Sequence, residues 1–332
     1  MSTLDEIRKK LQSLDNKQSG NYTNTDKTTY PHWNMPEGTS ATIRFLPDGD
    51  SDNTFFWVEK QIIKLKFPGI KGQDENKEVE VQVPCMEMYG DSCPILNEIR
   101  PMWKDPSLED TARKYWKKRS YLFQGFVKQN PINDDVTPEN PIRKFIIGPQ
   151  IFPLIKAALL DPELTNVPTD YVLGLDFIIA KTSKGGHSDY TTSKWSRRES
   201  SLTDEQTEAI DKHKLFKLND FLPKKPTPEV LAVIFEMFEA SLSGELYDSE
   251  KWAKYYKPFG FDSAEADGGE SKKSSRPSRP VSKPTPTPTP DVEDDDAPFE
   301  TESPKAKESA ETSTTGKSPQ EILQMLRNRN KS

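Results

Sequence analysis

The sequence has few of the residues on which catalytic and disulfide-stabilised proteins depend. Its 332 residues include only two cysteines, Cys85 and Cys93, and three histidines. Two cysteines exclude a disulfide framework and favour a reducing compartment. No histidine belongs to a known nucleophile motif, and no strand-like run precedes a glycine-rich phosphate loop. We therefore expect no enzymatic activity, although a site of scattered carboxylates that meet only in the fold stays open.

Long apolar runs are missing as well. No stretch is long enough to span a bilayer, and the amino terminus is amphipathic, unlike the basic and then apolar start of a signal peptide. We expect a soluble, intracellular protein with no membrane partner.

Apolar content is low for a fully folded chain, at 33% hydrophobic against 30% charged residues. The 28 prolines include Ser-Arg-Pro and Thr-Pro repeats within residues 271–290. Such repeats bury too little apolar surface to offset the entropy of ordering. We expect a folded core over residues 31–261 and a disordered linker over residues 262–317.

The net charge of −7 is unevenly distributed. Acid gathers in residues 291–300, whereas cations cluster at residues 8–10, 113–119 and 194–198. A chain that is acidic as a whole can still present a basic surface to a polyanion.

The core has the pattern of a mixed, β-rich fold. Short alternating or β-branched runs predict strands at residues 41–46, 55–66, 78–83, 121–128, 142–147 and 171–181. Helical spacing predicts helices at residues 107–116, 149–160, 203–214 and 228–243. No regular βαβ alternation appears, so a small barrel with added helices fits better than a doubly wound sheet. The strongly apolar helix at 228–243 should close the core, with Met237 and Phe238 buried in it.

The two ends differ from this core. Leu4, Ile7, Leu11 and Leu14 have helical spacing beside the basic residues 8–10, and residues 15–29 read as a linker. Residues 1–30 therefore form either a detachable basic arm or a helix packed on the core. At the other end, residues 318–321 form a capping-box pattern, so residues 318–332 are either a short docking helix or an unfolded end.

Two segments mix aromatic rings with cations. Residues 113–123 contain five cations and four rings, and residues 187–198 repeat the mixture after a glycine turn. Cations neutralise phosphates and rings stack on unpaired bases, which is the chemistry of single-stranded nucleic-acid binding. The alternative is that Trp116, Phe123 and Trp195 are core aromatics and that the cations only solvate strand edges.

Several short segments, in this order and spacing, resemble the helix-destabilising single-stranded-DNA-binding proteins of T-even-type bacteriophages. The resemblance covers roughly residues 1–260, and the matching pieces are Ile43-Arg-Phe-Leu-Pro47, Tyr89-Gly-Asp-Ser-Cys-Pro94, Lys117-Lys-Arg-Ser-Tyr121, Lys144-Phe-Ile-Ile-Gly148, Asp176-Phe-Ile-Ile-Ala-Lys181 and Ser188-Asp-Tyr190. It implies an OB-fold core with a basic cleft, an arm for cooperative binding and an acidic tail that recruits replication proteins.

The resemblance and the ring-and-cation segments together give the expected DNA-binding residues: Tyr89, Arg113, Lys114, Tyr115, Lys117, Lys118, Arg119, Tyr121, Phe123, Lys144, Phe145, Tyr190, Lys194, Trp195, Arg197 and Arg198. The arm for self-association along DNA would use Ile7, Arg8, Lys9, Lys10 and Leu11. The partner-binding tail would use Asp294, Asp295, Asp296, Phe299, Ile322, Met325 and Leu326.

The chain departs from the family at its metal site. The family's zinc subdomain uses one histidine and three cysteines, whereas this chain keeps Cys85 and Cys93, has Leu96 at the third position and has no histidine in residues 60–77. A closed zinc site needs four such ligands. We expect no zinc, and a subdomain around residues 60–110 held by apolar packing of Ile95, Leu96 and Ile99.

The leading hypothesis is a non-enzymatic protein of the host cell cytoplasm that coats single-stranded DNA during phage replication, recombination and repair. Its tail would recruit phage polymerase, helicase loader, primase and recombinase factors. An RNA-binding regulator and a structural docking module remain alternatives, distinguished by affinity for RNA or for neither nucleic acid.

Overall fold

A computed structural model describes residues 28–73, 76–132 and 138–259. The predictions for the arm and linker at residues 1–30, apart from residues 28–30, and for the linker, acidic run and docking helix at residues 262–332 therefore lie outside the described residues. Within the described part, every helix is too short or too polar to cross a bilayer.

The fold is built on eight antiparallel strands in the order β3-β2-β4-β1-β6-β7, with β5 paired to β4 and β8 paired to β6. Their bounds are β1 (Thr39–Phe45), β2 (Trp57–Phe67), β3 (Val79–Pro84), β4 (Lys118–Gln129), β5 (Arg143–Ile147), β6 (Leu175–Lys184), β7 (His187–Asp189) and β8 (Lys194–Glu199). The first six confirm the six predicted strands. Among the described residues the pairing stays open, so a closed barrel is not formed.

β4 is the longest strand and has different partners along its length. Residues 118–123 of β4 pair with β2 and residues 125–129 pair with β1, so β1 and β2 lie end to end along one edge of β4. β5 pairs with residues 121–125 along the other edge. β4 therefore pairs with β2 at its beginning and with β1 at its end.

Six helices complete the described fold: α2 (Pro94–Ile99), α3 (Glu109–Tyr115), α4 (Phe152–Leu159), α5 (Asp204–His213), α6 (Pro228–Ser243) and α7 (Ser249–Trp252). Four short 3-10 turns join them: η1 (His32–Asn34), η2 (Met86–Tyr89), η3 (Arg100–Lys104) and η4 (Leu218–Phe221). α3 to α6 confirm the four predicted helices. Local chemistry sets the limits of α6, because Thr227 caps its start and Gly244 ends it in the left-handed conformation.

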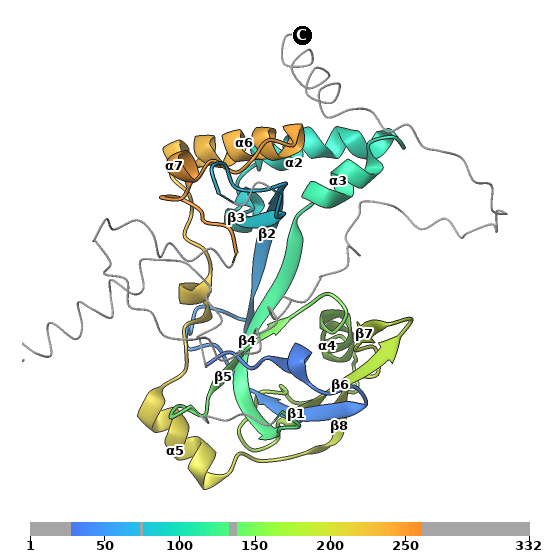
Figure 1. The fold of residues 1–332 in the computed structure, drawn as a ribbon. Helices are drawn as coiled ribbons and strands as arrows, with labels where there is room; N and C mark the ends of the chain where they lie inside the picture. Colours follow the sequence, from blue (N-terminus) through green and yellow to red (C-terminus); the bar gives the residue numbers. More distant parts are fainter. Residues whose placement is uncertain (1–27, 74–75, 133–137, 260–332) are drawn as a thin grey trace, which may run out of the picture.

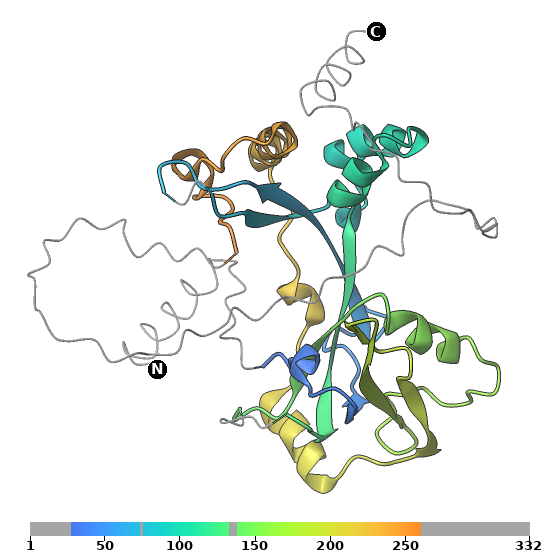
Figure 2. The same cartoon turned by 45° about the vertical axis from the view of Figure 1, so that its right-hand side comes forward.

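The hydrophobic interior is divided into two main clusters, and the molecule has two corresponding lobes joined by β2 and β4 (Figures 1 and 2). The helical lobe comprises residues 63–116 and 228–259, and the sheet lobe is built mainly on β1, β4, β5, β6 and α4. The predicted subdomain at 60–110 is thus only part of the helical lobe, which also takes α6 and α7 from the end of the core. Ile95, Leu96 and Ile99 are buried in it, as predicted.

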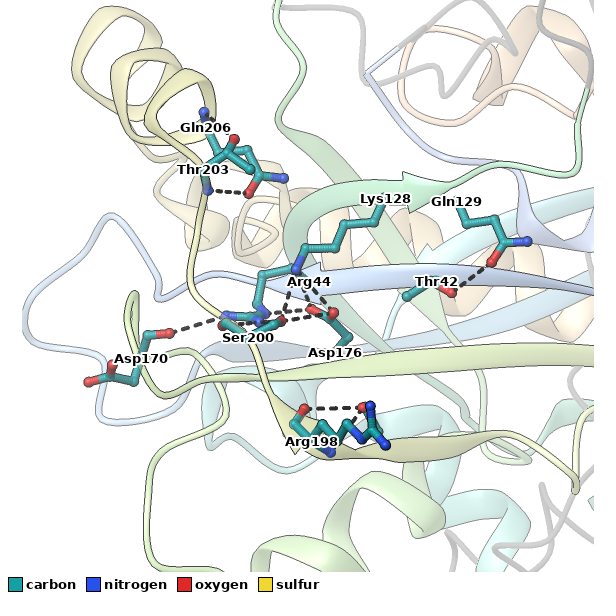
Figure 3. A network of polar contacts seen from close by, with 11 residues as sticks. Thr42, Arg44, Lys128, Gln129, Asp170, Asp176, Arg198, Ser200, Thr203 and Gln206 are labelled. Carbon is teal, nitrogen blue, oxygen red and sulfur yellow. Dashed lines mark hydrogen bonds and ion pairs between the residues drawn. The ribbon is translucent and has the colours of Figure 1, made fainter.

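The buried side chain of Arg44 links several segments of the sheet lobe (Figure 3). Arg44 on β1 has no exposed surface, and its Nε donates to Asp176 of β6 at 2.8 Å. The same guanidinium donates to the Asp170 carbonyl oxygen at 3.3 Å and to Ser200, and Lys128 of β4 also reaches Asp176. A buried guanidinium is stable only with partners of this kind. The network therefore holds β1 and β6 together with the segment before β6, which contains Asp170, and the residue after β8, Ser200.

Candidate nucleic-acid interface

A row of four aromatic rings crosses one face of the sheet lobe where β2 meets β4. Tyr121 of β4 stacks on Phe152 of α4 with ring centroids 3.4 Å apart and planes 8° apart. Phe152 contacts Trp57 at 5.5 Å, and Trp57 contacts Phe55 at 4.7 Å. Burial falls along the row, from 9% exposure of Tyr121 to 58% exposure of Phe55. The row therefore begins in the core and ends on the surface.

A basic side chain lies next to Tyr121 on the same face of β4. Arg119 lies two residues away on the same side of the strand and pairs with Glu59 at 3.4 Å, with 31% of its side chain exposed. A pair this exposed contributes at most about 1 kcal/mol.

Lys117, just before β4, is held more firmly. It is mostly buried, and its Nζ donates to Glu87 at 2.7 Å. Glu87 also accepts from Arg100. Burial by itself would raise the pKa of Glu87, but the bonds from Lys117 and Arg100 lower it below its ordinary value. Lys117 is therefore part of a fixed ion-pair cluster and a weaker candidate for phosphate contact than the sequence indicated.

The second basic segment forms strand β8, which the sequence did not predict as a strand. Lys194, Arg197 and Arg198 on β8 are exposed, and no ion pair to them occurs among the described residues. Trp195 between them turns inward against Phe177 and Phe45, at 5.0 and 5.9 Å. α4 packs against β8, so the helix that carries Phe152 also adjoins these cations.

Three rings predicted to stack on bases are instead core residues. Phe123 and Phe145 face each other across β4 and β5 with no exposed surface, and Tyr115 is 1% exposed beneath α6. Phe123 and Phe145 are enclosed in the core of the sheet lobe and Tyr115 in the core of the helical lobe, where no base can reach them. The prediction that these rings face DNA was wrong.

Tyr190 is also largely buried, at 9% exposure, with its ring 5.6 Å from that of His32. Tyr89 in η2 is half-buried, and its hydroxyl donates to the Pro223 carbonyl oxygen at 2.6 Å. Both rings are engaged within the protein. Among the described residues no aromatic pair joins either of them to the row that ends at Phe55, although Tyr190 belongs to the same hydrophobic cluster as Tyr121.

Lys144 lies on the opposite face of the sheet from Tyr121. It is paired with Gln124 in the register, and its ammonium sits 3.7 Å from the centre of the Phe221 ring. With Lys60 it lines a small cavity beneath η4, and burial lowers the pKa of Lys60 to about 8. The structure thus separates Lys144 from Arg119, which lies on the same face as Tyr121.

The remaining predicted cations belong to the helical lobe or its junction with β4. Arg113 pairs with Glu109 at 2.9 Å and lies over the Trp103 ring, and Lys114 lies over the Tyr115 ring. Lys118 donates to the Arg113 carbonyl oxygen at 3.4 Å. Arg113 and Lys114 are exposed on α3, so they remain available to a ligand that extends from Arg119 onto this lobe.

Cys85 and Cys93 lie together in the core of the helical lobe, both as free thiols. A hydrogen bond from Cys85 lowers the pKa of Cys93, and the same bond together with burial raises the pKa of Cys85. Within the described ranges, no group of three or more His, Cys, Asp or Glu side chains is placed to hold a metal. The expectation of no zinc stays a prediction.

The sequence-based list missed the exposed end of the ring row. Phe55, Trp57 and Phe152 were assigned only to a strand and a helix. The run of three aromatic residues at 55–57 was the available signal, because three consecutive rings cannot all point into one core when side chains alternate.

No known protein family matches the chain, and no curated protein is detectably similar to it.

Proposed function

We propose that this chain binds single-stranded DNA with little sequence preference, without catalysing a reaction. The observation that carries the proposal is the row from Tyr121 through Phe152 and Trp57 to the exposed Phe55, with Arg119 beside it. The outer part of this row, Phe55 with the half-buried Trp57 and Phe152, offers flat faces to unpaired bases, at about 1–3 kcal/mol per stacked base, while neighbouring cations neutralise phosphates.

The strand arrangement supports a finer assignment. β1, β4, β5, β6 and β8 with α4 resemble a partly open OB-fold-type barrel, a fold whose exposed strand face and loops bind oligonucleotides. On this proposal the bases follow the ring row, and the phosphates follow Arg119 on one side and the β8 cations Lys194, Arg197 and Arg198 on the other.

The wider role belongs to the same proposal. A protein that binds single strands more tightly than duplex lowers duplex stability by linkage, without fuel. Coating of transient single strands in phage replication, recombination and repair fits this property. Self-association through the arm and recruitment of replication factors through the acidic tail concern residues outside the described ranges and rest on the sequence.

The test is a tryptophan-fluorescence titration of the full chain with oligo-dT at two salt concentrations. We expect quenching, because Trp57 lies in the row, and affinity that falls as salt rises. Phe55→Ala should weaken binding about fivefold to tenfold, the lower end of the stacking range, because Phe55 is the outermost ring. Phe259→Ala, which removes another exposed ring outside the row, is the matched control and should bind like the parent chain.

The phosphate contacts have their own test. Replacing Arg197 and Arg198 with alanine should lower the slope of log affinity against log salt by about 1.4, or roughly 0.7 for each lost contact. The proposed surface would be contradicted if the Phe55→Ala variant bound oligo-dT as tightly as the parent chain. It would also be contradicted if the variant without Arg197 and Arg198 had the same salt slope as the parent chain. Tighter binding to oligo-U than to oligo-dT would move the ligand class to RNA.

A further inference from the structure

Exposed apolar side chains are concentrated in one segment of the sheet lobe. The described residues expose seven large hydrophobic side chains, and four of them belong to the connection between α4 and β6: Leu160, Val167, Val172 and Leu173, exposed by 73%, 62%, 67% and 43%. Concentrations of this kind mark interaction surfaces more often than scattered single residues do. We call residues 160–173 the docking segment.

The docking segment is held in a fixed conformation. Pro168 and Thr169 are buried, and the carbonyl oxygen of Asp170 accepts from the buried Arg44 at 3.3 Å (Figure 3). The Asp170 carboxylate accepts from the backbone N–H groups of Val172 and Leu173 at 2.8 and 2.7 Å. A partner that binds there meets apolar side chains already in place, which lowers the entropic cost of binding.

Two further hydrogen bonds join the docking segment to the end of β8 and to the residues that follow it. The Asn166 amide donates to Glu199 at the end of β8 at 2.9 Å, and the Leu202 N–H donates to the Tyr171 carbonyl oxygen at 2.8 Å. The segment also has one sign of charge, because Asp161, Glu163 and Asp170 are its only charged residues. It is therefore a rigid, apolar and acidic surface.

The complementary chemistry occurs at the end of the same chain. Residues 318–332 contain Ile322, Leu323, Met325 and Leu326 at helical spacing, and one acid is outnumbered by Arg327, Arg329 and Lys331. Residues 260–317 connect this segment to the described core. An unfolded chain of that length with the dimensions of a Gly/Ser-rich linker would have a root-mean-square reach of roughly 40 Å, and proline would extend it further. The radius of gyration expected for a core of this size is about 17 Å.

We propose that residues 318–332 dock on the docking segment of their own molecule. The apolar residues at 322–326 would cover Val167, Val172 and Leu173, and the arginines that follow would face Asp161, Glu163 and Asp170. This inference is independent of nucleic-acid binding, because none of these residues belongs to the ring row or to β8.

Hydrogen exchange with mass spectrometry tests the proposal on the full chain and on a chain that ends at Lys317. We expect the backbone amides of residues 160–173 to exchange several-fold more slowly in the full chain, because docking excludes water from them. Equal exchange in the two chains would overturn the proposal. Protection that disappears on tenfold dilution would show that a second copy docks, and would overturn docking within one molecule.

Substitutions on both sides separate docking from folding. Val167→Glu with Val172→Glu should abolish the difference in exchange while β5 and β6 exchange as in the parent chain, since both side chains are exposed. Tyr255→Glu, at another exposed apolar position, should keep the difference. Arg327→Glu with Arg329→Glu should also abolish it, whereas Lys305→Glu with Lys307→Glu makes the same change of charge outside the segment and should keep it. Any reversal of these four results would contradict the proposal.

Discussion

Arg44 and His32 are polar side chains that the fold buries in different ways. Arg44 is surrounded by carboxylate, carbonyl and hydroxyl oxygens that accept hydrogen bonds from its guanidinium. His32 is also buried, but its Nδ1 has no hydrogen-bond partner among the described residues. Burial first, and then the nearby charge of Lys181, lower the pKa of His32 from 6.5 to about 4. The fold therefore tolerates His32 only in its neutral form.

This burial makes stability depend on pH. Between pH 6.5 and 4 the unfolded chain binds a proton at His32 that the folded chain does not, so the free energy of unfolding falls as the pH is lowered through this window. From pH 7 to pH 5 we expect a loss of about 2 kcal/mol from this group. Urea unfolding should show that His32→Gln removes this part of the pH dependence. His187→Gln, at an exposed histidine, should leave the dependence as in the parent chain.

At the scale of elements, β4 decides how the sheet is arranged. Its residues 118–129 pair with β2, β1 and β5, so it lies in both lobes and carries Arg119 and Tyr121 to the ring row. The change of partner from β2 to β1 brings two backbones very close at Gly125. A Cβ added there would lie 2.1 Å from the Arg44 carbonyl oxygen. Only glycine allows this approach.

We therefore expect Gly125→Ala to destabilise the fold by more than about 2 kcal/mol, because β4 must move away from β1 and the buried Arg44 network is disturbed. Thermal or urea unfolding measures the change. Gly148→Ala is the matched control, because a Cβ at Gly148 meets no atom within 4 Å. Comparable losses in the two variants would contradict the close approach as the cause.

At the scale of the whole molecule, two separate cores share one sheet. The helical lobe is closed by α6, where Phe238 is fully buried against Tyr115 with ring centroids 5.3 Å apart. The core of the sheet lobe is formed by other residues, such as Phe45, Phe145 and Phe177. Among the described strands, β2 and β4 run through both (Figure 2). Loss of packing in one lobe should therefore remain largely local.

Phe238→Ala should lower stability by about 3–5 kcal/mol, the usual cost of a cavity left by a buried phenylalanine. Hydrogen exchange should accelerate in β3, α2 and α3, whereas β5 and β6 should change little because their core is intact. The corresponding variant Phe145→Ala should give the opposite pattern. Uniform acceleration in both variants would show that the two cores unfold as one unit.

The sequence by itself determined most of the described elements. Alternating runs gave six of the eight strands, and helical spacing gave the four longer helices, because these patterns depend on neighbours within one segment. β7 and β8 were missed because a three-residue strand and a charged edge strand carry little apolar alternation. α2 and α7 were missed because they are only six and four residues long.

Only the tertiary structure decided which side chains are accessible. The residues next to Phe123 and Phe145 in the sequence do not distinguish these rings from an exposed one. Both rings nevertheless meet across β4 and β5 in the core, whereas Phe55 lies on the surface. Burial depends on partners that are distant in the chain, and a shift of one residue in a strand exchanges its two faces. The sequence therefore supplied the rings and cations, and the packing of distant segments around β4 decided which of them can meet a ligand.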